Sequence, residues 1–386
     1  MTGTQTAASW EGERPAYGPE HLALREQVRR FLTHELDQHG ERWEREGITD
    51  RAFWLRAGQQ GLLGPQVPEA WGGPGLDVSY NFLISEEIAY AAAPNGIQTH
   101  SDVCIDYLLH YASDELKARW LPGTIDGSVI TAIAMTEPGA GSDLRGIRTR
   151  ARREGDHFVI SGSKTYISNG QNADIVITAL KTDTAPERLS LILVEGTREG
   201  FRRGRNLDKI GHHSADTSEL FFDEVRVPVG NLIGAEGRGL SMLVQQLPQE
   251  RLSIAVAAQA GAQRAYDEAL AFVRDRVAFG KRVLDFQNTR FVLADMKSQL
   301  QVGWAHLDWA IGRHLAGDLT ADEAAAAKLW HTEGQWKIVD AALQLHGGAG
   351  YMNEYLIARL WRDSRVLRIY GGTSEIMQEV IGRALG

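Results

Sequence analysis

The stretch Met135-Thr136-Glu137-Pro138-Gly139-Ala140-Gly141-Ser142-Asp143-Leu144 separates two parts of the chain that differ in hydrophobic pattern. Taken alone, Gly139 and Gly141 could form the phosphate-binding turn of a dinucleotide fold, which needs a strand before the glycines and a helix after them. Here an arginine-rich segment follows and leads into another strand pattern. The pattern therefore disfavours a Rossmann fold, and a turn that joins two strands is the simpler local interpretation.

The residues that precede this stretch have the hydrophobic period of helices. One apolar face recurs at helical spacing and consists of Leu24, Val28, Phe31 and Leu32. Residues 80–92 and 107–120 also have a helical pattern. A glycine- and proline-rich loop at 64–75 precedes these two segments. We expect Leu121-Pro122-Gly123 to end the last of these helices.

The residues that follow the stretch change to short runs rich in Val, Ile, Phe and Thr, separated by turn residues. These runs cover residues 129–135, 157–161, 175–179, 189–194 and 220–223. Such runs predict an antiparallel sheet or a barrel-like β domain. After residue 240 the period is helical again, over 251–277, 286–316 and 321–345, which predicts an antiparallel helix bundle.

The order α, β, α predicts an α+β multidomain protein with an N-terminal helical domain, a central antiparallel β domain and a C-terminal four-helix bundle. We assign these domains to residues 19–127, 128–238 and 239–386, and residues 1–18 to a flexible N-terminus. Glu11, Glu13 and the lack of an apolar core argue against a signal or transit peptide. No apolar run approaches the length of a membrane span.

Composition limits the classes of function. The 386 residues include 43% hydrophobic and 24% charged side chains, as in ordinary globular proteins. A net charge of −9 argues against a nucleic-acid surface. Cys104 is the single cysteine, which excludes a disulfide framework within the chain and indicates a reducing cytoplasm. We predict no metal site, because the adjacent His212 and His213 cannot easily bind one ion together.

Five motifs of the chain resemble those of the acyl-CoA dehydrogenases, in the family's order and at its spacing. They are Met135–Leu144, Gly162-Ser163-Lys164-Thr165-Tyr166-Ile167-Ser168-Asn169-Gly170, Arg276-Val277-Ala278-Phe279-Gly280-Lys281 followed by Asp285-Phe286-Gln287, Gln344-Leu345-His346-Gly347-Gly348-Ala349-Gly350-Tyr351, and Ile369-Tyr370-Gly371-Gly372-Thr373-Ser374-Glu375-Ile376. The resemblance extends over roughly residues 20–384 and is strongest in motif to the long-chain branch. It implies the family's fold, an FAD cofactor and the α,β-dehydrogenation of an acyl-CoA thioester.

The resemblance also implies which residues bind FAD. They are Met135, Thr136, Gly141, Ser142, Tyr166, Ser168, Arg276, Phe279, Gln287, Gln344, Gly348, Thr373 and Glu375. Backbone amides in a glycine-rich turn can approach flavin oxygens closely, because no Cβ intervenes. Such hydrogen bonds stabilise negative charge on a reduced flavin. Without the resemblance, Tyr166 would be interpreted as a core tyrosine of a hairpin, and Arg276 as a solvated cation at a helix end.

The catalytic base has two possible positions in the family. Many members carry a glutamate directly after the tyrosine of the last motif, where this chain has Gly371. Leu247-Pro248-Gln249-Glu250-Arg251-Leu252 resembles the alternative placement found in the long-chain and isovaleryl branches. The resemblance therefore implies that Glu250 removes the α-proton while a β-hydride passes to flavin N5. Position alone leaves a plainer interpretation open, in which Glu250 is favoured by the dipole in the first turn of a helix beginning near Pro248.

The sequence says less about the residues that form the acyl pocket. By resemblance, substrate contacts are made by Asn95, Thr99, Val103, Ser142, Arg251, Tyr370 and Gly371. Asp102 and Asp106 lie on the same segment as Asn95, and a buried acid there would disfavour a long alkyl tail. A medium- or long-chain acyl-CoA, and a place in fatty acid and lipid metabolism, is the first expectation. A branched, polar or carrier-protein-bound acyl group is the alternative.

The resemblance implies two kinds of partner. The family is typically a homotetramer, and the intersubunit role carried over to Arg276 and Gln344 requires at least a dimer. Electrons would pass to an electron-transferring flavoprotein. Two rival functions stay open, an acyl-CoA oxidase that reacts with oxygen and a non-catalytic acyl-CoA-binding protein in which Glu250 does not reach the substrate.

Overall fold

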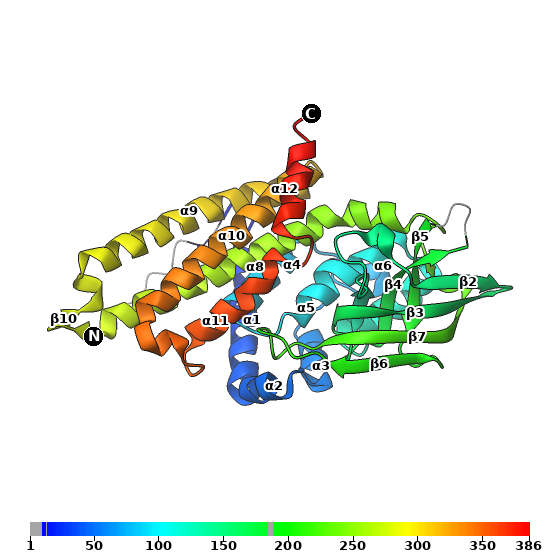
Figure 1. Ribbon diagram of the computed structural model, residues 1–386, viewed down its shortest axis with the longest axis horizontal. Helices are drawn as coiled ribbons and strands as arrows, with labels where there is room; N and C mark the ends of the chain where they lie inside the picture. The colour runs from blue at the N-terminus through cyan, green and yellow to red at the C-terminus, as the bar shows by residue number, and fades with distance from the viewer. Residues whose placement is uncertain (1–9, 13, 184–187) are drawn as a thin grey trace. The chain divides into compact units, whose positions relative to one another are not determined.

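The computed structural model describes residues 10–12, 14–183 and 188–386, and the chain divides into two compact units. The first unit comprises residues 1–34, 82–93 and 251–386, and the second comprises 35–81 and 94–250. Figure 1 shows helices in both units and the sheet in the second. Among the described residues, no helix combines the length and the apolar run that crossing a membrane requires.

The helices of the second unit lie on both sides of the 64–75 loop in the sequence. They are η1 (Leu36–Gly40), α2 (Glu41–Glu46), α3 (Arg51–Gln59), η2 (Glu69–Trp71), α5 (Gly96–Gln98), η3 (Thr99–Cys104), α6 (Ile105–Tyr111) and α7 (Asp114–Asp126). Because η3 is a π-helix that runs into α6, residues 96–111 form one nearly continuous rod. Pro122 lies inside α7, so the expectation that it ends the helix was wrong. The turn continues there with the Thr124 hydroxyl donating to the Leu121 carbonyl at 2.8 Å.

The sheet of the second unit has the strand order β6-β7-β3-β2-β4-β5-β8, with β1 paired to β4. The strands are β1 (Thr131–Ala134), β2 (Arg150–Glu154), β3 (His157–Ser168), β4 (Ile175–Thr182), β5 (Arg188–Glu195), β6 (Phe201–Asn206), β7 (Thr217–Pro228) and β8 (Leu232–Ile233). Most pairings are antiparallel, but β1 and β2 each pair with β4 in parallel. The expected antiparallel sheet is therefore corrected to a mixed one. Residue alternation reports which face of a strand is buried and carries no information on strand direction.

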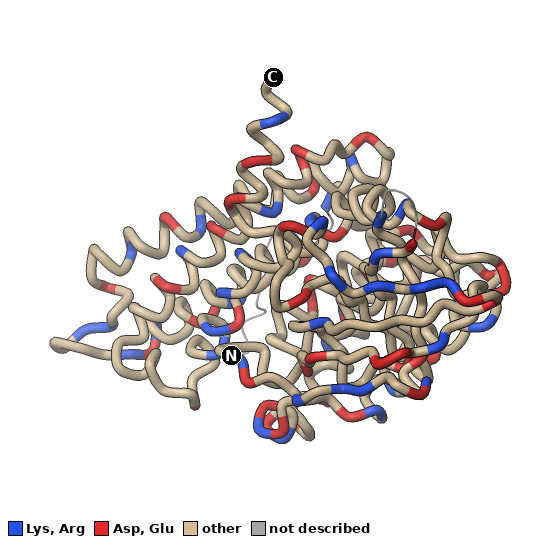
Figure 2. Tube along the Cα trace, turned by 45° about the vertical axis from the view of Figure 1, so that its right-hand side comes forward, with Lys and Arg blue, Asp and Glu red and all other residues tan. Residues whose placement is uncertain are grey.

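Both faces of the central strands are buried. Ile175 and Ile177 of β4 pack with Leu108 and Leu121 of the helices, whereas Val176 packs on the opposite face with other strands. This two-sided burial explains the continuous apolar run of β4. On β2 and β7, Arg152 contacts Glu154 at 2.6 Å and Arg226 contacts Glu154 at 2.9 Å. Figure 2 accordingly shows basic positions beside acidic ones along these strands.

The first unit is a bundle of long helices. Its elements are α1 (Pro19–Glu35), α4 (Ser79–Tyr90), α8 (Gly239–Asp275), α9 (Gln287–Leu315), α10 (Ala321–His346), η7 (Gly347–Tyr351), α11 (Leu356–Ser364), η8 (Arg365–Arg368) and α12 (Ser374–Arg383), with the hairpin β9 (Val277–Ala278) and β10 (Lys281–Arg282). Helices α1, α4 and α8 cross the boundary, and residues 239–250 of α8 belong to the second unit. Small side chains such as Ala262, Ala265 and Ala269 form the seam of the bundle, where they permit close helix packing.

The described part of the N-terminus is packed, which corrects the expected flexible segment 1–18. Arg14 is buried and binds Glu86 of α4 at 2.8 Å and Asp308 of α9 at 2.9 Å. Trp10 stacks on Trp304 with ring centroids 5.2 Å apart. Buried ion pairs and stacked rings of this kind hold residues 10–12 and 14–18 on the bundle. Residues 1–9 and 13 lie outside the described residues.

Candidate active site

The candidate base, Glu250, lies on α8 beside helix α6. The Tyr107 hydroxyl donates a hydrogen bond of 2.9 Å to Oε1 of Glu250. Glu250 is 7% exposed. Burial, followed by the Glu250 charge, raises the pKa of the Tyr107 phenol well above its usual value, so that Tyr107 stays protonated and donates. The contact therefore points a permanent donor at a buried carboxylate.

Glu250 does not lie in the first turn of its helix. Helix α8 begins at Gly239 and contains Pro248 in its interior. The helix therefore starts well before the position expected from the proline. Because the dipole effect fades beyond the first turn, it does not explain a buried glutamate at position 250. The structure therefore argues against the interpretation of Glu250 as a first-turn residue that only the helix dipole favours.

Two further acids lie beside the Glu250–Tyr107 contact on the helical rod of residues 96–111. Asp102 and Asp106 are 2% and 3% exposed. Asp106 accepts hydrogen bonds from the side-chain amides of Gln66, at 3.0 Å, and Gln249. Burial raises the pKa of Asp106 to about 7, and the charges of Asp102 and Glu250 act in the same direction while the Gln66 bond opposes them.

Gly371 lies in the loop between η8 and α12, and two features of the first unit require glycine there. Its φ is +64°, a left-handed conformation that side chains disfavour. A Cβ at this position would lie 2.3 Å from Cδ1 of Ile254. Ile254 is one helical turn beyond Glu250 on α8. The space that a glutamate at 371 would need is therefore filled by the helix that carries Glu250.

The next residue, Gly372, is held by a buried lysine. Lys328 of α10 is fully buried and its Nζ donates to the Gly372 carbonyl at 2.5 Å. Burial lowers the pKa of Lys328 to about 8, and the nearby Arg251 charge acts in the same direction. Lys328 therefore fixes the backbone of the loop from inside the bundle.

The first two motifs meet in the second unit. The Thr165 N–H donates to the Thr136 carbonyl at 2.9 Å, and Nζ of buried Lys164 donates to the Met135 carbonyl at 3.0 Å. Lys164 also pairs with Glu137 at 2.9 Å. Burial tends to raise the pKa of Glu137, but the hydrogen bonds from Thr149 and Lys164 outweigh it and keep the pKa below its usual value. A charged, buried network thus ties the glycine turn to β3.

Tyr166 is not a core tyrosine. It is 69% exposed, has a φ of +60°, and lies in an irregular stretch of β3 between Lys164 and Ile167. An exposed aromatic ring on a strained backbone is a feature of binding sites. In the adjoining turn, a Cβ added at Gly139 or Gly141 would meet no protein atom within 4 Å. The face of the turn is therefore open, as the approach of a planar cofactor requires.

Three family models match: "Acyl-CoA dehydrogenase, N-terminal domain" over residues 18–128, "middle domain" over 132–225 and "C-terminal domain" over 237–386. The chain belongs to the acyl-CoA dehydrogenase family. Members of this family are FAD-dependent oxidoreductases.

Individual relatives match this chain along most of their length. The mitochondrial long-chain specific acyl-CoA dehydrogenase of Sus scrofa is 42% identical over 379 residues, covering 97% of this chain and 88% of the relative. A solved acyl-CoA dehydrogenase from Geobacillus kaustophilus has a TM-score of 0.93 at 43% identity, covering 96% and 98% of the two chains. A glutaryl-CoA dehydrogenase from Mycobacterium smegmatis, solved in complex with FADH2, has a TM-score of 0.90 at 26% identity, covering 96% and 95%.

The FAD residues implied by the acyl-CoA dehydrogenase family fall into two groups. Met135, Thr136, Gly141, Ser142, Tyr166 and Ser168 belong to the second unit, where Lys164 and the Thr165 N–H tie Met135 and Thr136 to β3. Arg276, Phe279, Gln287, Gln344, Gly348, Thr373 and Glu375 belong to the first unit. The first group offers backbone amides and an aromatic ring and the second offers an arginine, which are residue types suited to a flavin dinucleotide.

The second group lies at two ends of the bundle (Figure 1). Thr373 and Glu375 flank the start of α12, whose Ser374 binds Glu333 of α10 at 2.6 Å. Gln344 lies eleven residues farther along α10, about 16 Å at the rise of an α-helix. Phe279, at the tip of the β9–β10 hairpin, is 97% exposed. One copy of the bundle therefore does not gather these residues at a single point.

The expected substrate residues are also divided between the units. Asn95, Thr99 and Val103 are half-buried and follow one another along one side of the rod in the second unit, whereas Ser142 is exposed on the glycine turn. Arg251, Tyr370 and Gly371 belong to the first unit, where Tyr370 packs on the small apolar cluster around Ile254.

Four residues of the site were not anticipated from the sequence. They are Tyr107, Lys164, Ile254 and Lys328, each of which contacts a motif residue through its side chain. Lys164 lies between Ser163 and Thr165 in β3, so its burial could not be predicted from the sequence. The other three have ordinary residue types for a helix and carried no signal.

Proposed function

We propose that this member of the acyl-CoA dehydrogenase family oxidises the Cα–Cβ bond of a medium- or long-chain acyl-CoA, with Glu250 as the base that removes the α-proton. The observation that carries the proposal is the buried contact of Glu250 with Tyr107, together with the filled space at Gly371. These two features favour one position for the base over the other. The 42% identity with a long-chain enzyme supports the substrate class.

The environment of Glu250 suits a general base. A carboxylate removed from water is less well solvated, which strengthens it as a proton acceptor. The Tyr107 hydroxyl compensates part of this cost and orients the carboxylate through Oε1. Glu250 thus holds its lone pair in a defined direction before the thioester arrives.

The FAD site would be built by the residues described above, with Met135, Thr136 and the glycine turn against the ring system and the first-unit residues toward the phosphates and adenosine. Bound FAD supplies a two-electron acceptor for the β-hydride. The chain's own part is to keep the turn rigid through Lys164 and Glu137 and to present Tyr166 on the exposed side of β3.

The same arrangement supports a homo-oligomer of at least two copies, and we propose the tetramer. Gln344 lies eleven residues along α10 from Glu333, which binds Ser374 next to Thr373, and Phe279 is almost fully exposed in one chain. Large exposed aromatic side chains are costly unless a partner covers them. We also propose a cytoplasmic location and an electron-transferring flavoprotein as the acceptor of the electrons.

An anaerobic titration tests the function. Purified protein with bound FAD is mixed with acyl-CoAs of increasing length, and the flavin absorbance is followed. Bleaching by medium or long chains supports the proposal, and bound ligand without bleaching supports an acyl-CoA-binding protein instead. Rapid recolouring in air with formation of peroxide indicates an oxidase. Bleaching by carrier-protein thioesters alone indicates a carrier-bound substrate.

The role of Glu250 is tested by Glu250→Gln, which keeps an oxygen for the Tyr107 hydrogen bond. We expect FAD content and ligand binding to persist while the bleaching rate falls about a thousandfold, as for loss of a general base. Glu115→Gln, at an exposed position of α7, is the matched control and should bleach normally. Normal bleaching by Glu250→Gln would remove the assignment.

A further inference from the structure

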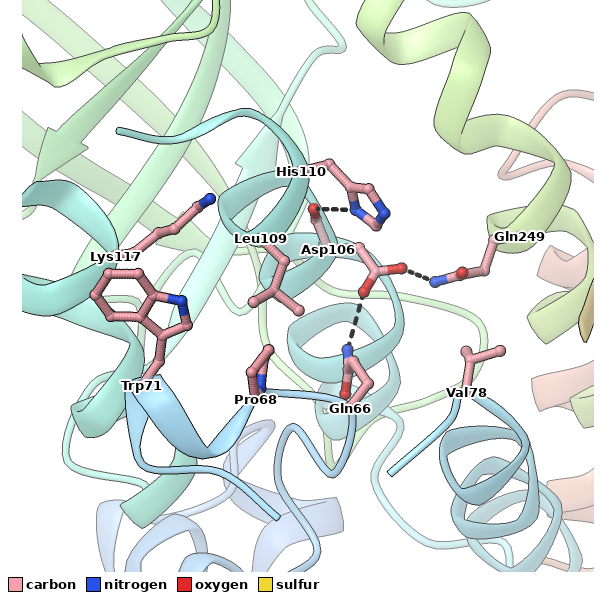
Figure 3. A pocket seen from close by; sticks show the side chains of 9 residues that line it. All are labelled: Gln66, Pro68, Trp71, Val78, Asp106, Leu109, His110, Lys117 and Gln249. Atoms are coloured by element: carbon pink, nitrogen blue, oxygen red, sulfur yellow. Dashed lines mark hydrogen bonds between the residues drawn. The ribbon is translucent and has the colours of Figure 1, made fainter. Parts of the chain in front are cut away.

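A pocket of about 390 Å³ lies next to the candidate base in the second unit. Its wall is partly apolar, with Trp71, Val78 and Leu109, and partly polar, with Gln66, Asp106 and Gln249 (Figure 3). Asp106 precedes Tyr107 on α6, and Gln249 precedes Glu250 on α8. Two neighbouring contacts therefore join these helices, one that holds the base and one that forms the polar side of the pocket.

The polar side consists almost entirely of hydrogen-bond acceptors. Asp106 accepts from the amide groups of both Gln66 and Gln249, which fixes how these two side chains are turned. With its N–H group bound to Asp106 and to the Ser101 carbonyl, Gln66 carries its Oε1 atom on the other branch of the amide. That oxygen is buried and has no hydrogen-bond partner among the described residues.

A buried acceptor without a donor has lost its hydrogen bonds to water, so the arrangement is unfavourable for the protein alone. The Asp106 carboxylate also retains acceptor capacity, because each of its oxygens can take more than one hydrogen bond. Beside Lys117 and His110, whose Nδ1 lies 2.8 Å from the Asp106 carbonyl, the pocket thus offers acceptors at Asp106 and Gln66. A ligand group that donates hydrogen bonds would relieve both conditions.

The acids disfavour an anion at the polar side of the pocket, because Asp106 lines it and buried Asp102 lies one helical turn away. Lys117 also lines the pocket and lies 3.9 Å from Asp114. A plain alkyl end would contact Trp71 and Leu109 favourably, but it would leave the Gln66 oxygen unsatisfied.

We propose that this pocket receives the distal end of the acyl chain and selects acyl groups that carry a hydrogen-bond donor there, a hydroxyl or an amino group. This inference rests on the proposed dehydrogenation and names its substrate class more closely. The apolar wall contacts the methylene groups, and the donor bonds to Asp106 and Gln66. The substrate is therefore supplied by a reaction that leaves a hydroxyl or amine far from the thioester.

The test uses the FAD-loaded enzyme and sets of acyl-CoAs with equal chain length, ending in a methyl, hydroxyl, amino or carboxyl group. Flavin bleaching is measured anaerobically over concentration at several lengths. At the length that spans the distance to the pocket, the hydroxyl or amino chain should half-saturate bleaching at about tenfold lower concentration than the methyl chain, as one net hydrogen bond gives. The carboxyl chain should be the poorest.

Two variants test whether Gln66 and Asp106 cause the preference for chains that end in a donor. Gln66→Leu removes the unsatisfied oxygen and Asp106→Leu removes the acid, and each should reverse the preference toward the methyl chain while FAD content stays normal. Lys117→Ala, at the edge of the pocket, should keep the preference. Should Asp106→Leu fail to fold, Gln66→Leu decides alone.

The outcomes separate the two proposals. Bleaching by methyl-ended chains with no gain from a donor at any length overturns the pocket assignment and leaves the dehydrogenation standing. A preference that survives in Gln66→Leu and Asp106→Leu also overturns it. If no thioester bleaches a flavin that dithionite still reduces, both proposals fail.

Discussion

The Tyr107 hydroxyl donates to Oε1 of Glu250 across 143 residues of sequence, at 2.9 Å. The phenol and the carboxylate are both buried, so the bond is stronger than it would be at the surface. It joins α6, on the rod of residues 96–111, to the helix that carries the base. The contact that packs these helices together therefore also orients the proposed base.

Replacing Tyr107 with Phe should impair the base without removing it. Loss of a donor destabilises the ionised carboxylate, so the acid side of the pH profile for bleaching should move upward by about one pH unit. The measurement is the bleaching rate against pH under anaerobic conditions. Tyr111→Phe is the matched control, because Tyr111 on the same helix binds Gln245 instead. Identical profiles for the two variants would show that the Tyr107 bond does not reach the base.

Gly371→Ala should destabilise the protein. The left-handed φ and the contact of 2.3 Å with Ile254 both oppose a Cβ, and we expect a loss of roughly 2 kcal/mol or more in the free energy of unfolding. Thermal unfolding of the FAD-bound protein measures it. Gly312→Ala, at an open position inside α9, should be neutral or stabilising. A Gly371→Ala melting temperature equal to that of the Gly312 variant contradicts the steric argument.

Lys164→Met should weaken both the fold and the flavin site. It leaves Glu137 buried without its cation, a change that typically costs about 3 kcal/mol. Because Lys164 also holds the Met135 carbonyl, FAD should dissociate more readily on dilution. Urea unfolding and the flavin absorbance retained after gel filtration report the two effects. Lys297→Met, on the exposed face of α9, serves as the control. Unchanged FAD retention in Lys164→Met would limit its role to stability.

The buried His100 should make stability depend on pH in the acid range. Burial lowers its pKa from 6.5 to about 4, and its Nδ1 accepts from the Thr131 N–H at 3.2 Å while Nε2 meets the Thr124 carbonyl. Between these two pKa values the unfolded chain binds more protons, so stability is complete above about pH 6.5 and falls as pH decreases toward 4. The loss amounts to roughly 3 kcal/mol.

Urea unfolding at pH 7 and pH 5 measures this loss. His100→Gln cannot take up the proton, so its stability should depend less steeply on pH than that of the natural protein. Parallel slopes for the two proteins would assign the acid sensitivity to other groups.

Several features of the fold follow from local patterns. The period of apolar residues predicted α1, α9 and α10 closely, since a buried helix face repeats every three or four residues. The same logic failed where proline was taken as a boundary, because Pro122 and Pro248 both lie inside helices whose packing tolerates them. The pattern of apolar residues also could not predict strand direction, and β4 pairs in parallel with β1 and β2.

The sequence by itself determined the family and its cofactor chemistry, because glycines, an arginine and a glutamate at characteristic spacings have few alternative explanations. It also singled out Glu250 and the empty position at Gly371. Only the tertiary structure decided that Tyr107 contacts Glu250, that Ile254 fills the space at Gly371, and that Asp106 lines a pocket. The spacing of residues in the sequence indicates local structure and motifs, whereas these contacts join residues far apart in sequence. Their partners are selected by packing, which no local pattern encodes.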